Sequence, residues 1–354
     1  MVEFGIAELA AMHERKMIRN DSDVDANCCI DVEQKKSARI KESTERISKD
    51  FVMFHPQTAI VPEARPFAHY TLLKIRRNDA QVLAQLQALP TRIDALNVEH
   101  PMAQLALSVA FTKSFWARLE QPCPPELIEF APLGQGDIVA HSSDVDVLIH
   151  LHSLRHDLHF YVLSQLLAHI ADDVDVVDET AGFRYLDARD MTMFIDGTEN
   201  PKTAEQRAAV ACIADGDFAG GSYVMLQRFE HNLPAWNRLN IQAQEKVIGR
   251  TKADSVELET VPAASHVGRV DLKQNGKGLK IVRHSLPYGS VSGVHGLLFI
   301  AYCHTLHNFQ AMLESMYGIT DGKTDQLLHF TQAKTGAYFF SPSLEMLARL
   351  SVVE

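Results

Sequence analysis

Several residue patterns that would indicate a familiar class of site are missing from this sequence. The five cysteines, at positions 28, 29, 123, 212 and 303, form no CxxC pair, no zinc-ribbon spacing and no CxxCH motif for attaching a cofactor covalently. Thiols without such spacing are typical of a reducing compartment. We therefore expect free cysteines and a cytoplasmic protein.

Long basic and long apolar runs are missing as well. The chain has 34 Lys and Arg residues against 45 Asp and Glu residues, and no long Lys/Arg run to hold a phosphate backbone. It has no stretch of about twenty apolar residues, and charged residues follow the N-terminus too soon for a secretory signal. We expect no nucleic-acid partner, no membrane span and no export signal.

The composition that remains is that of an ordinary globular protein. With 354 residues, 46% of them hydrophobic, the chain can bury a sizeable core, and its length favours two domains. Residues 1–52 are dense in charge of both signs and poor in aromatics, which predicts a flexible N-terminal extension. We place the two domains at residues 53–190 and 191–354.

Hydrophobic periodicity gives both domains the same general plan. The first domain has a β-α-β order twice, which is the ferredoxin-like split arrangement, and the second alternates strands and helices in a similar way. Both are expected to be α+β domains. The predicted strands are 68–75, 103–111, 144–152, 173–179, 220–229, 295–303 and 336–340, and the predicted helices are 78–89, 159–170, 233–249, 306–318 and 343–350.

One short stretch, "MFIDGTENP" at Met193–Pro201, carries an aspartate out of an apolar run into a glycine turn. Asp-Gly and Asn-Pro are both turn dipeptides, so a tight turn at the end of a buried strand is the favoured interpretation from these residues alone. A functional carboxylate at Asp196 is the alternative.

Histidine is abundant, with 17 residues, and one group is dense. His150, His152, His156 and His159 lie in "LIHLHSLRHDLH", and the first two would share one face of a strand, as metal ligands could. No Asp or Cys completes a recognisable ligand set. Surface or half-buried histidines are therefore favoured over a metal site.

Three other residues offer chemistry at separate places in the chain. His266 follows a small-residue loop, whereas the rival His231 ends a strand where a polar cap is common. Arg283 stands between apolar residues, so a buried salt-bridge role is as plausible as a catalytic one. With Asp196 these residues form a set that chemistry could use, because a neutral histidine ligates haem iron while an acid and an arginine can split a peroxide. Spacing alone does not show that they meet.

These segments carry a family resemblance. The stretch around Asp196 resembles the GxxDG-type signature of the dye-decolourising peroxidases, with Met193 where that motif usually has its first glycine. Further segments resemble the compact B-type bacterial branch, and the match runs from about Gln57 to Leu350, more specifically in its second half. They are "GGSYVMLQRFEHNLPAWNRL", "VIGRTK", "SHVGRVDLKQNGKGLKIVRHSLPYG", "GVHGLLFIAYC" and "FTQAKTGAYFFSPSL".

The resemblance implies two ferredoxin-like domains with antiparallel sheets, of the dimeric α+β barrel superfamily, and a non-covalent haem b. It implies that Asp196 is the distal acid, His266 the proximal iron ligand and Arg283 the distal arginine, with Ser285 sharing their water network. The cofactor-binding residues it implies are Gly197, Thr198 and Glu199 along the haem, Leu297 and Phe299 as an apolar wall, and Asp325 as an acid partner of His266.

The function implied is a haem peroxidase that reduces hydrogen peroxide through a ferryl porphyrin-radical intermediate and oxidises dyes, phenols or other small aromatic donors. Because the reference pKa of aspartate is about 3.9, we predict faster dye oxidation at roughly pH 4 to 5 than at neutral pH. Large donors could pass electrons to the haem through surface aromatics, for which Tyr223, Trp236 and Tyr288 are candidates, but a role as packed core or turn aromatics is favoured for all three.

Two other functions stay open at this point. One is a haem-handling protein that releases or stores porphyrin or iron, and the other, less favoured, is an α+β binding module without haem. The family resemblance also implies a homo-oligomer, a dimer or a larger assembly.

Overall fold

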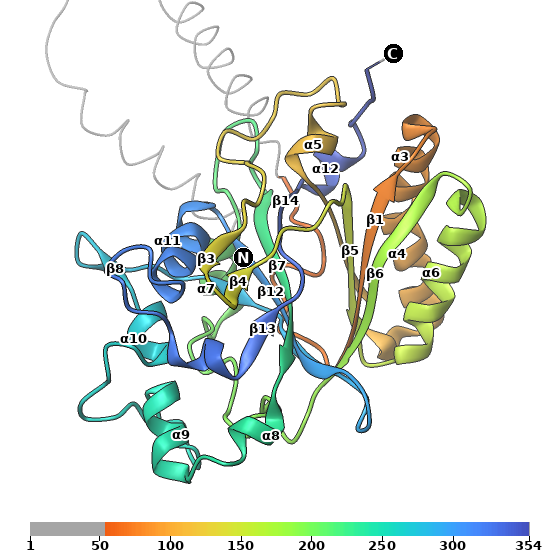
Figure 1. The fold of residues 1–354 in the computed structure, drawn as a ribbon. Coiled ribbons are helices and arrows are strands. Elements are labelled where there is room, and N and C mark those ends of the chain that lie inside the picture. The colour runs from red at the N-terminus through yellow and green to blue at the C-terminus, as the bar shows by residue number, and fades with distance from the viewer. Residues whose placement is uncertain (1–53, 354) are drawn as a thin grey trace, which may run out of the picture. The chain divides into compact units, whose positions relative to one another are not determined.

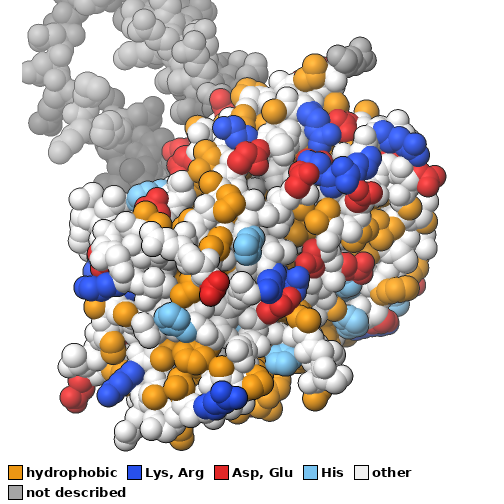
Figure 2. Space-filling model, viewed as in Figure 1, with side chains coloured by type: hydrophobic (Ala, Val, Ile, Leu, Met, Phe, Trp, Pro, Cys, Tyr) orange, Lys and Arg blue, Asp and Glu red, His pale blue; other side chains and the backbone are white. Residues whose placement is uncertain are grey.

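The computed structural model describes residues 54–353, and the predicted extension at residues 1–52 lies outside this range. No helix among the described residues is long and apolar enough to cross a membrane. Figure 2 shows cationic and anionic side chains interspersed over one face of the molecule.

The first half builds four antiparallel strands with helices on one side. The strand order is β6-β1-β5-β2, and α3, α4 and α6 lie against the outer side of these strands (Figure 1). Their bounds are β1 (Phe67–Ile75), β2 (Ala106–Phe111), β5 (Val147–Ser153), β6 (Val174–Phe183), α3 (Asp79–Gln87), α4 (Leu89–Glu99) and α6 (His156–Ile170). The two predicted β-α-β units are present, with α4 as an additional helix.

The second half repeats this plan around a central strand pair. β7 (Ser222–His231) pairs antiparallel with β12 (His295–Cys303) along eight residue pairs, from Tyr223↔Cys303 to Glu230↔Gly296. The flanking strands are β10 (Val282–Arg283), β11 (Leu286–Gly289), β13 (Thr331–Ala333) and β14 (Ala337–Ser341).

The two halves close into one barrel. β11 pairs with β6 at Tyr288↔Gly182, and β14 pairs with β2 at Phe340↔Phe111, so the strand circuit returns to β7 and β12. One apolar cluster takes buried residues from nearly every strand of this circuit, including Tyr70, Leu148 and Ile300, and so marks the barrel interior. The α+β fold of two ferredoxin-like halves is confirmed.

The remaining helices are short, and four of them gather on the side of β7 and β12 away from the barrel interior (Figure 1). These are α8 (Leu233–Trp236), α9 (Ile241–Ile248), α10 (His266–Val270) and α11 (His307–Met316). The other short elements are α5 (Lys113–Trp116), α7 (Ala204–Ala211), α12 (Leu344–Leu347), η1 (Pro101–Ala103), η2 (Gln326–His329), β3 (Leu133–Gln135), β4 (Ile138–Ala140), β8 (Lys273–Gln274) and β9 (Lys277–Gly278).

The single helix predicted over residues 233–249 is wrong, because the chain forms α8 and α9 with a break between them. The Asn240 side chain accepts a hydrogen bond from the Ala243 backbone N–H and so begins a new helix. Asparagine side chains compete with helical backbone bonds in the middle of a helix and favour caps, which explains the break.

The favoured interpretation of the histidine-rich stretch is also wrong for most of its members. His150 and His152 are buried in the barrel interior and His159 is on the buried face of α6, while His156 alone is exposed. No group of three or more His, Cys, Asp or Glu side chains within residues 54–353 is placed to hold a metal ion. His150, His152 and His159 are core residues rather than surface or half-buried residues.

Candidate active site

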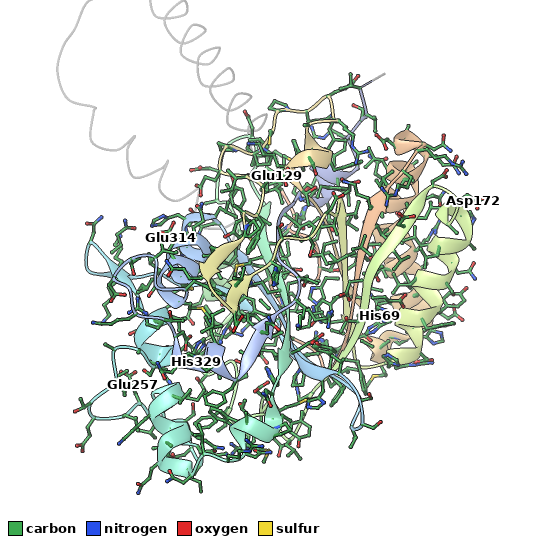
Figure 3. All side chains as sticks on the ribbon, in the orientation of Figure 1. His69, Glu129, Asp172, Glu257, Glu314 and His329 are labelled. Carbon is green, nitrogen blue, oxygen red and sulfur yellow. The ribbon has the colours of Figure 1, made fainter. Side chains whose placement is uncertain are left out.

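A deep pocket lies between the helices α9 to α11 and the side of β7 and β12 that faces away from the barrel interior. It encloses 1630 Å³ of atom-free space, including its open mouth. Figure 3 shows Glu257, one of its lining residues, on the α9 side of the molecule, away from His69 and Asp172. Seven of the residues named from the sequence line this pocket: Asp196, Thr198, Glu199, His266, Arg283, Leu297 and Phe299.

The turn after Ile195 places the carboxylate of Asp196 at the pocket. Gly197 has φ +74°, a left-handed conformation that glycine adopts without strain, and its N–H donates to Asp196 Oδ1 at 2.6 Å. The Asn200 N–H donates to the Gly197 carbonyl at 3.1 Å and completes the turn. The segment therefore forms the predicted tight turn and also places a carboxylate at the pocket.

Asn200 connects this turn to β10, which carries Arg283. Its side-chain amide donates to the Arg283 carbonyl at 2.7 Å, and its side-chain oxygen accepts from the Arg283 N–H at 2.9 Å. The guanidinium Nη1 of Arg283 then lies 3.2 Å from Asp196 Oδ1. The two groups come from positions 87 residues apart in the chain, and the paired amide bonds hold the segments that carry them together.

His266 begins α10, and a buried acid holds its ring. Its Nδ1 lies 2.7 Å from Oδ2 of Asp325, whose side chain is 0% exposed. Asp325 caps η2 by accepting from the Leu327 N–H at 2.9 Å, which fixes the carboxylate. An imidazole whose Nδ1–H is donated to a carboxylate has its lone pair on Nε2, and Nε2 of His266 has no hydrogen-bond partner within the described chain. The ring is thus prepared to ligate a metal through Nε2.

The wall beside these groups is apolar. Leu297 and Phe299 alternate with the interior residues of β12, so their side chains face the pocket. Further apolar residues line the same space from β7 and from the helices: Met225, Phe229, Ile248, Val267, Val270, Met312, Leu313, Met316, Leu327 and Leu328. A large flat apolar ligand matches such a lining.

Cations lie among the polar residues of the lining. Arg250 Nη2 is 2.6 Å from Glu199 Oε1, and Lys280 Nζ is 3.5 Å from Glu199 Oε2. Partial burial acts to raise the pKa of Glu199, but the hydrogen bond and charge of Arg250, helped by Lys280, leave it below its usual value. Arg250 Nη2 also lies 3.7 Å from Glu257 Oε2, and Lys280 Nζ lies 4.0 Å from Asp271 Oδ1, so the group holds two cations and three carboxylates at the pocket.

Sequence reasoning missed a second acid–histidine pair in the same pocket. His231, considered only as a rival to His266, has Nε2 3.0 Å from Asp190 Oδ1 and Nδ1 2.7 Å from Thr331 Oγ1. Burial acts to raise the pKa of Asp190, but His231 and Thr192 lower it to about 2. Both ring nitrogens of His231 therefore have partners, which distinguishes it from His266. No local pattern marks Asp190 as a partner of His231, because the two residues are 41 positions apart in the chain.

Three of the ten site residues that the resemblance implies lie outside the lining of this pocket, namely Gly197, Ser285 and Asp325. Gly197 and Ser285 line a neighbouring pocket, which shares Asp196 and Arg283 with the first, and the Ser285 hydroxyl accepts from the Ile300 N–H at 3.3 Å. Met193 lines neither pocket and is 37% exposed, with φ +72°. The methionine therefore leaves the pocket unnarrowed and places a side chain where the backbone is left-handed.

The aromatic residues considered for electron transfer are core residues. Trp236 and Tyr223 are each 1% exposed, and Trp236 Nε1 donates to the Thr192 carbonyl at 3.1 Å. Tyr288 is also buried, with its hydroxyl near Arg228. The packing interpretation describes all three.

Comparisons with known proteins agree in sequence and in structure. The family model "Dyp-type peroxidase, N-terminal" matches residues 57–184, and "Dyp-type peroxidase, C-terminal" matches residues 187–346. A dye-decolorizing peroxidase of Mycolicibacterium paratuberculosis is 36% identical over 300 residues, covering 82% of this chain and 84% of the relative.

Solved structures give the same result. A dye-decolorizing protein from V. cholerae is 71% identical, with a TM-score of 0.83, over 84% of this chain and 100% of that chain. A Rhodococcus jostii RHA1 DypB variant in complex with heme is 34% identical, with a TM-score of 0.77, over 83% of this chain and 98% of that chain.

Proposed function

Since this chain belongs to the Dyp-type peroxidase family, a family of oxidoreductases with haem as cofactor, we propose that His266 ligates the haem iron and that Asp196 and Arg283 act on peroxide. The observation that carries this proposal is one pocket that combines a carboxylate-held histidine with an aspartate–arginine pair 3.2 Å apart. The activity is reduction of hydrogen peroxide coupled to oxidation of dyes and other aromatic donors.

The pocket residues fit haem b in three respects. Nε2 of His266 lacks a partner among residues 54–353 and lines the pocket, so it would bind the iron, with Asp325 holding the ring. The apolar wall that includes Leu297 and Phe299 would cover the porphyrin. Arg250 and Lys280 would pair with the two propionate groups. When bound, the haem supplies the iron that receives electrons from donors and passes them to peroxide.

The protein's own contribution is proton transfer and charge stabilisation. Asp196 accepts the proton from one peroxide oxygen and returns it to the other, while Arg283 stabilises the negative charge that develops as the O–O bond breaks. Ser285 acts on the same side through the neighbouring pocket that it shares with both groups. Gly197, Thr198 and Glu199 shape the turn along the cofactor.

An optimum near pH 4 to 5, as a rough range, stays a prediction that follows from the low reference pKa of aspartate. We also propose a homo-oligomer and small aromatic donors as partners. One solved relative, from Mycobacterium smegmatis, is described as an encapsulated DyP-type peroxidase. A cytoplasmic location stays a prediction, and among the described cysteines Cys123, Cys212 and Cys303 are free.

The test combines absorption spectroscopy with rapid kinetics. The purified protein, loaded with haem, should show a Soret band, and Asp196→Ala should slow its reaction with peroxide by about 10²- to 10⁴-fold while the band stays. Asp215→Ala, which removes an exposed aspartate outside both pockets, is the matched control. Equal rates in the Asp196 and Asp215 variants would contradict the assignment, and release of porphyrin or iron without donor oxidation would favour a haem-handling role.

A further inference from the structure

The neighbouring pocket shares Asp196 and Arg283 with the pocket that we propose holds the haem, called the haem pocket from here on. The charge of the neighbouring pocket is opposite to that of the whole chain. The chain carries a formal net charge of -11, yet this pocket is lined by five cations and two carboxylates. The cations are Arg184, Arg189, Lys202, Arg207 and Arg283, and the carboxylates are Glu63 and Asp196. We call it the cationic pocket.

Ion pairs neutralise only part of this charge. Arg207 lies 3.4 Å from Glu63, and Arg283 lies 3.2 Å from Asp196. The other three cations have no carboxylate within 4.0 Å among residues 54–353. The cationic pocket therefore carries a surplus of about three positive charges, and a concave site focuses such a field.

Two of these three cations keep donors available for a ligand. Arg184 donates through Nη2 to the Ala64 carbonyl at 2.8 Å, and Lys202 donates through Nζ to the Thr198 carbonyl at 2.9 Å. A guanidinium has five N–H donors and an ammonium three, and both side chains are exposed. Arg189 differs, because its three bonds to the carbonyls of Met193, Lys252 and Ala253 commit it to the fold.

The rest of the lining is suited to an aromatic ring. Tyr185, which is half-buried, provides an aromatic ring, and the buried residues Leu286 and Pro287 add apolar atoms to the lining. Asp196 and Arg283 line both pockets, so a ring in the cationic pocket would sit beside the groups proposed to act on peroxide. Hydrogen peroxide is small and neutral, so its binding requires neither the positive charge nor the aromatic ring of this pocket.

We propose that the cationic pocket binds an aromatic electron donor that carries a carboxylate or sulfonate group, with Lys202 and Arg184 as its anion partners. This inference rests on the proposed peroxidase function, which supplies the oxidant. For a phenolic donor ArOH, each molecule loses one electron and its hydroxyl proton, so that H2O2 + 2 ArOH gives 2 H2O + 2 ArO•. The local charge thus favours anionic donors, although the chain as a whole is acidic.

The test measures binding to the resting haem-loaded protein without peroxide, so it can fail while the peroxidase activity stands. The probe is 4-hydroxybenzenesulfonate, and isothermal titration calorimetry gives its dissociation constant. Because partly exposed ion pairs are worth about 0.2 to 1 kcal/mol, Lys202→Gln should weaken binding by roughly 1.4- to 5-fold, and adding Arg184→Gln should weaken it further. Raising the ionic strength from about 0.01 M to 0.15 M should weaken it as well.

The matched control is Lys113→Gln, which removes one exposed positive charge outside the pocket and should leave the dissociation constant unchanged. In turnover, the ratio of the KM values for 4-hydroxybenzenesulfonate and the cationic phenol tyramine should rise in the Lys202 and Arg184 variants. The proposal is overturned if Lys113→Gln weakens binding as much as Lys202→Gln does. It is also overturned if inorganic sulfate binds the same site as tightly as the probe, because the site then recognises an anion without its ring.

Discussion

Arg283 and His284 are consecutive in the chain, yet they belong to opposite sides of the same sheet. Arg283 faces the pockets and has a carboxylate 3.2 Å away. His284 does not line the haem pocket and is buried between the barrel interior and the wall of the cationic pocket, where its Nε2 lies 3.1 Å from the Ile60 carbonyl and its Nδ1 has no partner among the described residues. Two adjacent residues thus have different partners: Arg283 lies beside an opposite charge, whereas His284 contacts only a neutral carbonyl.

The histidines show the same contrast. His266 has a carboxylate at Nδ1, whereas the interior histidines have only neutral partners: His150 a tyrosine hydroxyl, Tyr302, at 2.8 Å, and His152 the Ala59 carbonyl at 3.3 Å. Burial, and then the other histidines, hold the pKa of both interior imidazoles well below the usual value. The partner, rather than the residue type, decides which histidine can serve a metal and which can only be packed.

The largest expected effect is loss of haem from one side of this comparison only. His266→Ala should reduce the Soret band strongly, because it removes the axial ligand. His284→Gln should keep the band, because a glutamine amide can still donate to the Ile60 carbonyl and the position does not line the haem pocket. Haem titration followed by absorption measures both variants.

The result that would refute the assignment is the reverse pattern. If His231→Ala lost haem while His266→Ala kept it, the histidine paired with Asp190 would be the ligand. The bonds at both ring nitrogens of His231 argue against this outcome.

The next effect concerns the stability of the barrel interior in acid. The unfolded chain protonates its histidines near pH 6.5, but burial, only partly opposed by the bond to Ile60, lowers the folded pKa of His284 to about 4. Below pH 6.5 the unfolded state binds protons that the folded state excludes, so stability is full above pH 6.5 and falls as the pH drops toward 4. This residue alone contributes a loss of about 3 kcal/mol over that window.

Thermal unfolding between pH 7 and pH 4 measures this effect. The variant His152→Gln with His284→Gln should lose less stability over the window than the parent protein, because glutamine does not titrate. Buried carboxylates act in a lower window, since the pKa of Asp190, lowered to about 2, affects stability only below about pH 4. Equal pH slopes in both proteins would show that the interior histidines do not cause the loss. Loss of stability through these histidines would then not limit the predicted acidic optimum of catalysis.

The sequence predicted local features well and long-range ones poorly. The strands at 68–75 and 295–303, and the Asp-Gly turn, follow from periodicity and turn chemistry over a few residues. The burial of His150 and His152 depends on the closure of two halves into one barrel, which no local pattern of β5 contains. The break between α8 and α9 was visible in Asn237 and Asn240 but was outweighed by a continuous apolar pattern.

The site shows the same division. Asp196, His266 and Arg283 were found through their motifs, while their meeting in one pocket is a property of the fold. Ser285 was named through the family resemblance, and the fold places it in the cationic pocket together with Asp196 and Arg283. Asp190 was missed because its partner, His231, is 41 residues away.

A smaller effect comes from Asn200, which joins the Asp196 turn to Arg283 through two hydrogen bonds. Asn200→Ala should lower the second-order rate with peroxide by roughly tenfold and weaken cyanide binding to the ferric protein, since each hydrogen bond is worth about 1 kcal/mol. Asn97 offers a matched control. Its side-chain amide donates to the Leu105 carbonyl and its side-chain oxygen accepts from the Leu105 N–H, both at 2.8 Å, and neither residue lines either pocket. Asn97→Ala should cost similar stability without changing either rate or cyanide affinity, and equal changes in both variants would reduce Asn200 to a structural residue.

The smallest effect separates the backbone near the pocket from the side chains within it. Met193 has φ +72°, a left-handed conformation that costs a residue with a Cβ about 1 to 2 kcal/mol. Glycine there relieves this strain but adds freedom worth about 0.4 to 1 kcal/mol to the unfolded chain, so Met193→Gly should stabilise the fold by no more than about 1.6 kcal/mol. Asn78, with φ +55°, is the control, because asparagine tolerates this conformation better and Asn78→Gly should gain less. In calorimetry the melting temperature of Met193→Gly should rise by no more than about 3 °C. A lower melting temperature would mean that the methionine side chain, whose Sδ lies 3.9 Å from the Tyr185 hydroxyl, stabilises the turn more than the backbone strain destabilises it.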